Sequence, residues 1–225
     1  MKILIVDNNI DKPWGLCGDF RRYLDGESIV RRGPQSDLPL DPKTFTHVIL
    51  SGSKTSCLDL SPWTIELMEF VRQTVDAGVP LFGVCYGHQI IAKSYGGETV
   101  VRRSDSPEIG WVEIRQKKAH PLLESLPQKF YTFQSHFEEV ARLPAGFVNT
   151  AESDRCAIQA YYMTGKPVYG VQFHPERNAQ EGQQSIDKQK LATPKDCIFK
   201  DGQAKSVFTE NVARTIFRNF LARNK

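Results

Sequence analysis

The stretch PLFGVCYG at residues 80–87 decides the predicted fold. Residues 80–84 form a short apolar run that predicts a buried strand. The apolar residues at 90–92 follow closely and predict a helix that ends at the glycines 96–97. A strand that passes directly into a helix is typical of a parallel sheet, in which helices form the crossovers. The residue at this junction is Cys85.

The chain before this junction repeats the same alternation. Residues 3–6 and 46–50 are continuous apolar runs rich in β-branched side chains, which predicts two further buried strands. Apolar residues at a spacing of four in 16–24, and an apolar stripe in 61–78 that starts with Ser-Pro, predict two helices. The β-α-β-α order predicts an α/β fold with a doubly wound, mostly parallel sheet flanked by helices.

The second half of the chain has a different pattern of predicted elements. Its strand-like segments are short and are joined by proline and glycine turns: 98–103, 109–115, 129–133, 147–150, 157–162 and 167–173. This pattern predicts an additional antiparallel region, followed by a helix over 209–222. Residues 177–206 are polar and without a clear period, so we expect them to be either a functional flap or disordered. Residues 1–225 are expected to form a single domain.

Composition excludes several classes of protein. The net charge is +3, from 29 Lys+Arg and 26 Asp+Glu, which is no nucleic-acid signature. Apolar runs stay far below the ~18 residues of a membrane span, and the N-terminal run is below the ~7–15 residues of a signal-peptide core. The five cysteines are widely spaced without a C-x-x-C motif. We therefore expect neither a disulfide framework nor a structural zinc site, and a cytoplasmic location.

Cys85 is the candidate nucleophile. A residue between a strand end and a helix start turns sharply, and flanking glycines relieve the crowding that such a turn creates. The helix N-terminus also favours a thiolate. Since an ordinary thiol with a pKa near ~8.5 is mostly protonated at pH 7, the reaction also needs a base. The alternative is an inert cysteine buried at a tight turn.

The sequence GVQFHPE at residues 170–176 supplies a candidate base. His174 and Glu176 are two apart, and Pro175 keeps the histidine in extended backbone, so both side chains point the same way. Glu176 can then orient one ring nitrogen while the other faces a nucleophile. A surface turn is the alternative. The His-x-Glu spacing does not match helical metal ligands, and neither a metal nor a cofactor is expected.

A tetrahedral intermediate formed by such a nucleophile also needs backbone N–H donors aimed at its oxygen. The backbone N–H of Tyr86, directly after the nucleophile, is one candidate. The loop at 51–53 follows another buried strand and provides Gly52 as the second. The alternative for Gly52 is an ordinary turn at the end of a strand.

With these pieces in place, the chain resembles the class I (triad-type) glutamine amidotransferases. The matching motifs are ILSGS at 49–53, GVCYGHQ at 83–89 and GVQFHPE at 170–176. The segments EIGW at 108–111 and QSHFEEV at 134–140 resemble most the stand-alone members related to the amidotransferase domain of GMP synthase.

The resemblance implies roles for individual residues. It implies a catalytic triad of Cys85, His174 and Glu176, oxyanion donors at Gly52 and Tyr86, and substrate contacts from Gln89, Ser135 and His136. Gln89 lies one helical turn after the nucleophile and can face the same pocket, although a solvent-facing glutamine is the alternative. The sequence departs from the family pattern in two places, at residues 53–54 and at Phe137. Both departures touch the substrate cleft.

Three functions follow as hypotheses. The first is hydrolysis of the γ-amide of glutamine to glutamate and ammonia through a γ-glutamyl thioester. No phosphate-binding G-x-x-x-x-G-K-[ST] motif is present in the sequence, so the ammonia either passes to a separate synthetase partner or is released. The second is hydrolysis of γ-glutamyl peptides with the same triad. The third is a non-catalytic binding or regulatory protein on this scaffold.

Overall fold

The computed structural model describes residues 1–10 and 16–223, with side chains from residue 19 onward in the second range. Within these ranges ten strands form one sheet. The strands are β1 (Lys2–Asp7), β2 (Glu27–Arg32), β3 (His47–Leu50), β4 (Leu81–Val84), β5 (Val101–Gln116), β6 (Lys129–Val140), β7 (Phe147–Glu152), β8 (Ala160–Met163), β9 (Val168–Val171) and β10 (Ile198–Phe199). The α-helices are α1 (Leu16–Arg21), α2 (Pro62–Asp76), α3 (Tyr86–Gly96), α4 (Ala179–Gln189), α5 (Ala204–Val207) and α6 (Glu210–Leu221).

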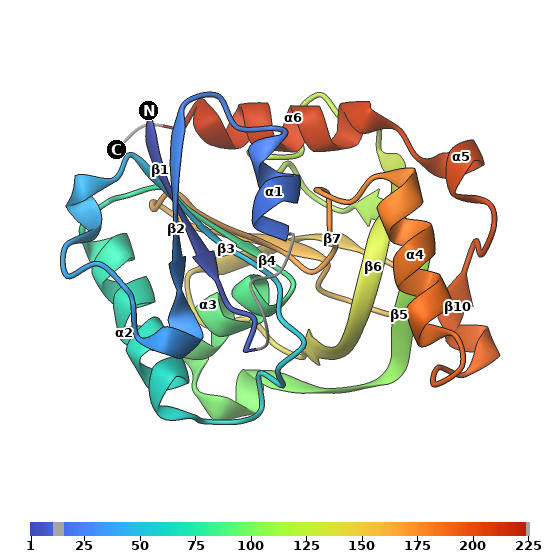
Figure 1. The fold of residues 1–225 in the computed structure, drawn as a ribbon, viewed down its shortest axis with the longest axis horizontal. Helices are drawn as coiled ribbons and strands as arrows, with labels where there is room; N and C mark the ends of the chain where they lie inside the picture. Colours follow the sequence, from blue (N-terminus) through green and yellow to red (C-terminus); the bar gives the residue numbers. More distant parts are fainter. Residues whose placement is uncertain (11–15, 224–225) are drawn as a thin grey trace.

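The sheet has a parallel part and an antiparallel part. Its order is β10-β5-β7-β8-β9-β4-β3-β1-β2, with β6 paired to β5 (Figure 1). Strands β2, β1, β3, β4 and β9 run parallel to one another, whereas β9, β8, β7, β5 and β6 pair in an antiparallel way. The predicted fold class is therefore confirmed. The carboxyl ends of β3, β4 and β9 consequently lie side by side at one edge.

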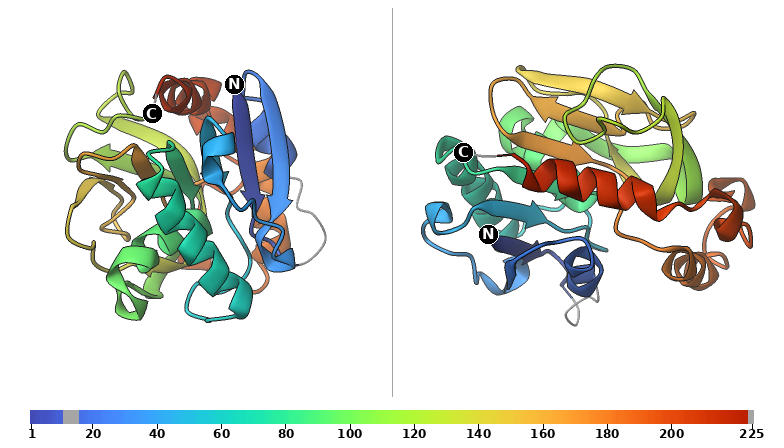
Figure 2. Two further views of the ribbon diagram at one scale, coloured as in Figure 1. Left: turned by 90° about the vertical axis from the view of Figure 1, so that its left-hand side faces the viewer. Right: turned by 90° about the horizontal axis from the view of Figure 1, so that it is seen from above.

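Both faces of the parallel part are covered by helices. On β1, Ile3 and Ile5 point to one side and pack in a core that includes residues of α6. Leu4 and Val6 point to the other side, in a core that includes residues of α2 and α3. Figures 1 and 2 show α6 across one face of the sheet and α2 with α3 across the other. Because both faces are buried, the central strands β1, β3, β4 and β9 are mostly apolar, as the sequence pattern indicated for 3–6, 46–50 and 80–84.

Two differences occur near the N-terminus. Helix α1 ends at Arg21, so Leu24, the last residue of the predicted stripe, follows the helix. Leu16 and Cys17 have side chains outside the described part of the chain. Strand β2 was not predicted, because it lies at the edge of the sheet and only two of its six residues are apolar.

Two differences also occur in the second half. Residues 101–103 and 109–115 of two predicted strands belong to one long strand, β5, whose pairing with β6 shifts between Arg103 and Glu108. Residues 98–100, predicted to begin the first of these strands, form a 3-10 helix instead. Residues 177–206, expected to lack regular structure, contain α4, β10 and α5.

Helix α4 has clear local causes. A capping box joins Asn178 and Glu181 at its N-terminus, which satisfies two backbone N–H groups there. Ile186 is fully buried in a core with Trp111 and Phe133. Among the described residues, no helix has both the length and the apolar character needed to cross a membrane.

Candidate active site

Three neighbouring strands bring the predicted motifs to one edge of the sheet. Gly52 comes two residues after β3, Cys85 directly follows β4, and His174 lies three residues beyond β9. Because these strands are adjacent and parallel, the three loops that follow them meet.

Cys85 has the strained backbone that a nucleophile elbow requires. Its φ is 52° and its ψ is −104°, outside the regions that side chains other than glycine favour, at a cost of about 1–3 kcal/mol. Two hydrogen bonds hold this geometry. The N–H of Cys85 donates to the carbonyl oxygen of Val171 at 2.9 Å, and the N–H of Gln89 donates to the carbonyl oxygen of Cys85 at 3.0 Å.

Gly83 and Gly87, on either side of Cys85, allow backbone segments to approach each other closely. A Cβ atom on Gly83 would lie 2.4 Å from the carbonyl oxygen of Gly87, and one on Gly87 would lie 2.4 Å from the carbonyl oxygen of Leu50. Both contacts are with backbone, which cannot move aside. The strain itself is at Cys85 rather than at its neighbours.

His174 and Glu176 form a buried pair. Nδ1 of His174 lies 2.7 Å from Oε1 of Glu176, and the side chains are 3% and 0% exposed. The pair is anchored through its backbone, since the N–H of His174 donates to the carbonyl oxygen of Phe133 at 2.8 Å. The guanidinium of Arg22 donates to the carbonyl oxygen of Glu176 at 2.9 Å.

The surroundings of His174 favour its charged form. Burial alone would lower the pKa of the imidazole, but it is outweighed by the negative charges of Glu176 and Cys85 and by hydrogen bonds to both. Together they raise the pKa of His174 to about 10. An imidazolium beside the sulfur is the arrangement that stabilises a reactive thiolate.

Cys85 opens into a cavity of about 560 Å³. Five of the eight predicted site residues line it: Cys85, Gln89, Ser135, His136 and His174. The sulfur of Cys85 lies 3.9 Å from the carbonyl oxygen of Ser135. Glu176 lies behind the imidazole, Gly52 is buried in the loop after β3, and Tyr86 is buried at the first position of α3, directly after Cys85.

Gln89 is held inside this cavity wall. It is only 3% exposed, so the alternative of a solvent-facing glutamine is wrong. Its Nε2 donates to the carbonyl oxygen of Glu138 at 2.8 Å and to Oε1 of Gln172 at 3.1 Å.

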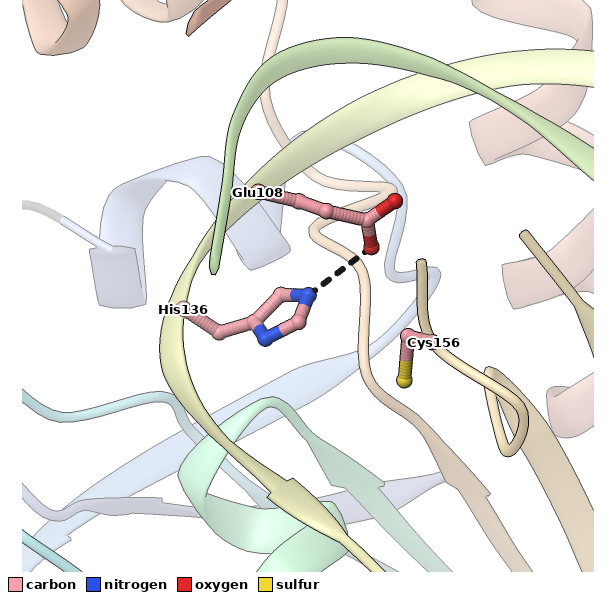
Figure 3. A group of neighbouring side chains, drawn as sticks. All are labelled: Glu108, His136 and Cys156. Atoms are coloured by element: carbon pink, nitrogen blue, oxygen red, sulfur yellow. Dashed lines mark hydrogen bonds and ion pairs between the residues drawn. The ribbon is translucent and has the colours of Figure 1, made fainter. Parts of the chain in front are cut away.

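His136 belongs to a buried network centred on Glu108 (Figure 3). The carboxylate of Glu108 accepts hydrogen bonds from Ser153 Oγ and Gln159 Nε2, both at 2.7 Å, and faces Nε2 of His136 at 3.1 Å. Nδ1 of the same ring faces the carbonyl oxygen of Glu138 at 3.1 Å. The network thus fixes the cavity-lining part of β6 from behind.

Cys156 lies beside this pair, and single ligand atoms of Glu108, His136 and Cys156 are within 4.8 Å of one another. The donor set does not favour a cation. Both oxygens of Glu108 already accept hydrogen bonds, and burial raises the pKa of the Cys156 thiol, which keeps it protonated. We interpret the group as a hydrogen-bonding network.

Sequence reasoning missed the role of Glu108, although its motif was noticed. A glutamate directly before the apolar residues of a strand was the available signal, because a buried charge needs partners. It also missed the contribution of α4. Gln189 donates to Ser135 Oγ at 3.2 Å, and Glu181 forms two hydrogen bonds with Arg22, at 2.6 and 2.8 Å. These contacts make α4 a wall of the cavity.

The fold and this cleft define a class of protein. Residues 27–193 match the model of the class-I glutamine amidotransferase family, and the chain belongs to that family. The family and the enzyme class expected from the sequence, a cysteine-dependent glutamine amidohydrolase, are therefore confirmed.

Two sequence relatives and one solved structure show in more detail which proteins this chain is similar to. The chain is 41% identical over 139 residues to a glutamine-hydrolysing GMP synthase subunit of Methanocaldococcus jannaschii, covering 60% of this chain and 66% of that protein, just under two thirds. It is 35% identical over 162 residues to the same subunit of Methanococcus aeolicus, covering 69% and 78%. A glutamine amidotransferase structure from Thermotoga maritima superposes with a TM-score of 0.78 over 98% of this chain and 96% of that one, at 20% identity, which bears on the fold alone.

Proposed function

We propose that the protein hydrolyses the γ-amide of glutamine with Cys85 as nucleophile, His174 as acid and base, and Glu176 as the group that orients the imidazole. The observation that carries this proposal is the buried His174–Glu176 pair, whose histidine lines the same cavity as the strained Cys85. This is the nucleophile–base–orienter arrangement of catalytic triads.

The reaction proceeds in two halves. The thiolate of Cys85 attacks the γ-carbon, and the oxygen that becomes negative accepts hydrogen bonds from the backbone N–H groups of Gly52 and Tyr86. The C–N bond then breaks, His174 gives its proton to the departing nitrogen, and ammonia leaves behind a γ-glutamyl thioester. Next, His174 takes a proton from water, whose oxygen attacks the thioester carbon. Glutamate leaves, and the thiolate–imidazolium pair is restored.

The amino-acid end of the substrate is held by other groups that line the cavity. Gln89 and the backbone around Ser135 and His136 face the same space as the sulfur. Because the network behind His136 is buried and satisfied, these groups are fixed before the substrate arrives, which reduces the cost of binding.

We further propose that the ammonia is passed to a separate synthetase in the cytoplasm. The relatives at 41% and 35% identity are subunits named for GMP synthase, and this sequence carries no phosphate-binding motif of its own. A partner that supplies the ATP-dependent step accounts for both facts.

A glutaminase assay of the isolated chain tests the triad, with Cys85→Ala as the decisive variant. Loss of the nucleophile should lower the rate by several orders of magnitude. Cys57→Ala is the matched control, because burial raises the pKa of that thiol to about 12 and makes it unreactive. A Cys85→Ala protein that released ammonia at the parental rate would refute the assignment.

A further inference from the structure

Three positive side chains surround the cavity without partners. Lys54 comes from the loop after β3, Arg103 from β5 and Lys188 from α4, and all three line the space that contains the sulfur of Cys85. Each is exposed, and none of the three makes an ion pair or a side-chain hydrogen bond with any described residue.

Two carboxylates, those of Glu138 and Glu181, also line the cavity, and both accept hydrogen bonds. The carboxylate of Glu138 accepts hydrogen bonds from Ser56 Oγ at 2.5 Å and from the N–H of Cys57 at 2.7 Å. Glu181 is bound by the guanidinium of Arg22. The donors to Glu138 are uncharged, so the three cations Lys54, Arg103 and Lys188 stand against this one carboxylate, and the lining keeps a positive surplus.

This surplus exceeds what glutamine alone requires. Free glutamine carries one carboxylate, which a single cation can match. The cavity of about 560 Å³ also falls in the range of about 300–1,000 Å³ that holds ligands larger than one amino acid. Phe137, 38% exposed on the cavity wall, adds an apolar surface beside the charges.

We propose that the site also accepts γ-glutamyl amides whose leaving amine carries a carboxylate, as in γ-glutamyl amino acids and γ-glutamyl peptides. Lys54, Arg103 and Lys188 attract the second carboxylate. The inference rests on the proposed thiol chemistry, which is unchanged. The γ-carbon–nitrogen bond breaks, His174 protonates the departing amine, the γ-glutamyl group stays on sulfur, and water then releases glutamate.

Three substrates separate this inference from the proposed function. Glutamine and γ-glutamylethylamide have uncharged leaving groups, whereas γ-glutamylglycine leaves with a carboxylate. We expect kcat/KM of the isolated chain to be higher for γ-glutamylglycine than for γ-glutamylethylamide, and this preference to shrink as salt is added, because exposed charges are screened.

Variants that remove one positive charge at a time test which side chains cause the preference for γ-glutamylglycine. Lys54→Gln, Arg103→Gln and Lys188→Gln should each lower the ratio of kcat/KM for γ-glutamylglycine to kcat/KM for γ-glutamylethylamide by about two- to fivefold, typical of exposed charge pairs. Lys190→Gln is the matched control. It directly follows α4, pairs with Asp187 and does not line the cavity.

The outcomes are distinct. Equal kcat/KM values for γ-glutamylglycine and γ-glutamylethylamide, or a preference that survives the triple variant, would overturn the inference and leave the thiol chemistry standing. Failure of the parent chain to hydrolyse any of the three substrates would overturn both.

Discussion

The backbone N–H of His174 donates a hydrogen bond to the carbonyl oxygen of Phe133, 2.8 Å away, and joins the imidazole to strand β6. Two residues further along that strand, the carbonyl oxygen of Ser135 lies 3.9 Å from the sulfur of Cys85. Strand β6 is thus in contact with both Cys85 and His174, the proposed nucleophile and base. A small displacement of this strand would reach both side chains.

Strand β6 is paired along its length with β5, and the Glu108 network fixes the side chain of His136 at its cavity-lining part, so removal of the network should affect substrate binding. In Glu108→Gln, the amide cannot accept from all three donors, and His136 loses its charged partner. A hydrogen bond to a charged group contributes about 1.5–3 kcal/mol, so we expect KM for glutamine to rise roughly tenfold or more, with a smaller change in the alkylation rate of Cys85 by iodoacetamide. Steady-state kinetics and alkylation measure the two effects.

Glu113→Gln is the control for that variant. Glu113 lies on β5, as Glu108 does, and its side chain pairs with the exposed Lys129. If both variants changed KM equally, or if Glu108→Gln altered only kcat, the positioning role would be wrong.

The pH profile should report the raised pKa of His174. With a pKa of about 10, the imidazolium persists through neutral pH, and kcat/KM should fall as pH rises through about 10, because the acid that protonates the leaving nitrogen is lost. The same shift stabilises the fold. That stabilisation is complete below pH 6.5, the ordinary pKa of histidine, and disappears as pH rises through about 10.

Glu176→Gln tests the cause of this shift. Removing the neighbouring negative charge should lower the pKa of His174 and move the alkaline limb of the profile to lower pH. An alkaline limb that stayed in place in this variant would show that another group titrates there.

The packing of Gly83 predicts a defined loss of stability. In Gly83→Ala, the new methyl group would lie 2.4 Å from a backbone oxygen, so we expect a loss of at least the ~1–3 kcal/mol typical of overpacked cores. Gly78→Ala is the comparison, since position 78 has open space but a φ of 69°. It should cost only about 1 kcal/mol. Chemical denaturation gives both values, and the larger loss at position 78 would contradict the packing argument.

The contact between Arg22 and Glu181 predicts that α4 depends on the end of α1. Arg22→Gln removes two hydrogen bonds to Glu181 and one to the carbonyl oxygen of Glu176. Because Arg22 is partly exposed, we expect a modest coupling of about 0.5–1 kcal/mol with Glu181→Gln in a double-mutant cycle. Hydrogen exchange in α4 should also accelerate, and unchanged exchange would indicate that other contacts hold the helix.

The sequence was most informative where structure is determined locally. The segments at 49–53, 83–89 and 170–176 each end a buried strand, and parallel pairing of those strands brings them together. Strand β2 was missed because edge pairing needs little apolar surface. Helix α4 was missed because it combines one capping box with a single large buried residue, Ile186.

Long-range polar contacts were beyond sequence reasoning for another reason. Glu108 is 28 residues from His136 and 51 from Gln159, and no spacing rule connects them. Only the folded sheet shows that these three side chains share one buried site. The same holds for Arg22 and Glu181, which are 159 residues apart.

The left-handed backbone at position 85 has one more consequence. Glycine tolerates such angles best because it has no Cβ atom, so the conformation is expected to be easier to adopt with glycine at this position than with cysteine. At this position, the residue that is best for the stability of the fold is therefore not the one that provides a reactive thiol. Selection for thermal stability alone would favour glycine at position 85, which removes the thiol. A protein that keeps cysteine there is less stable but retains the reactive sulfur.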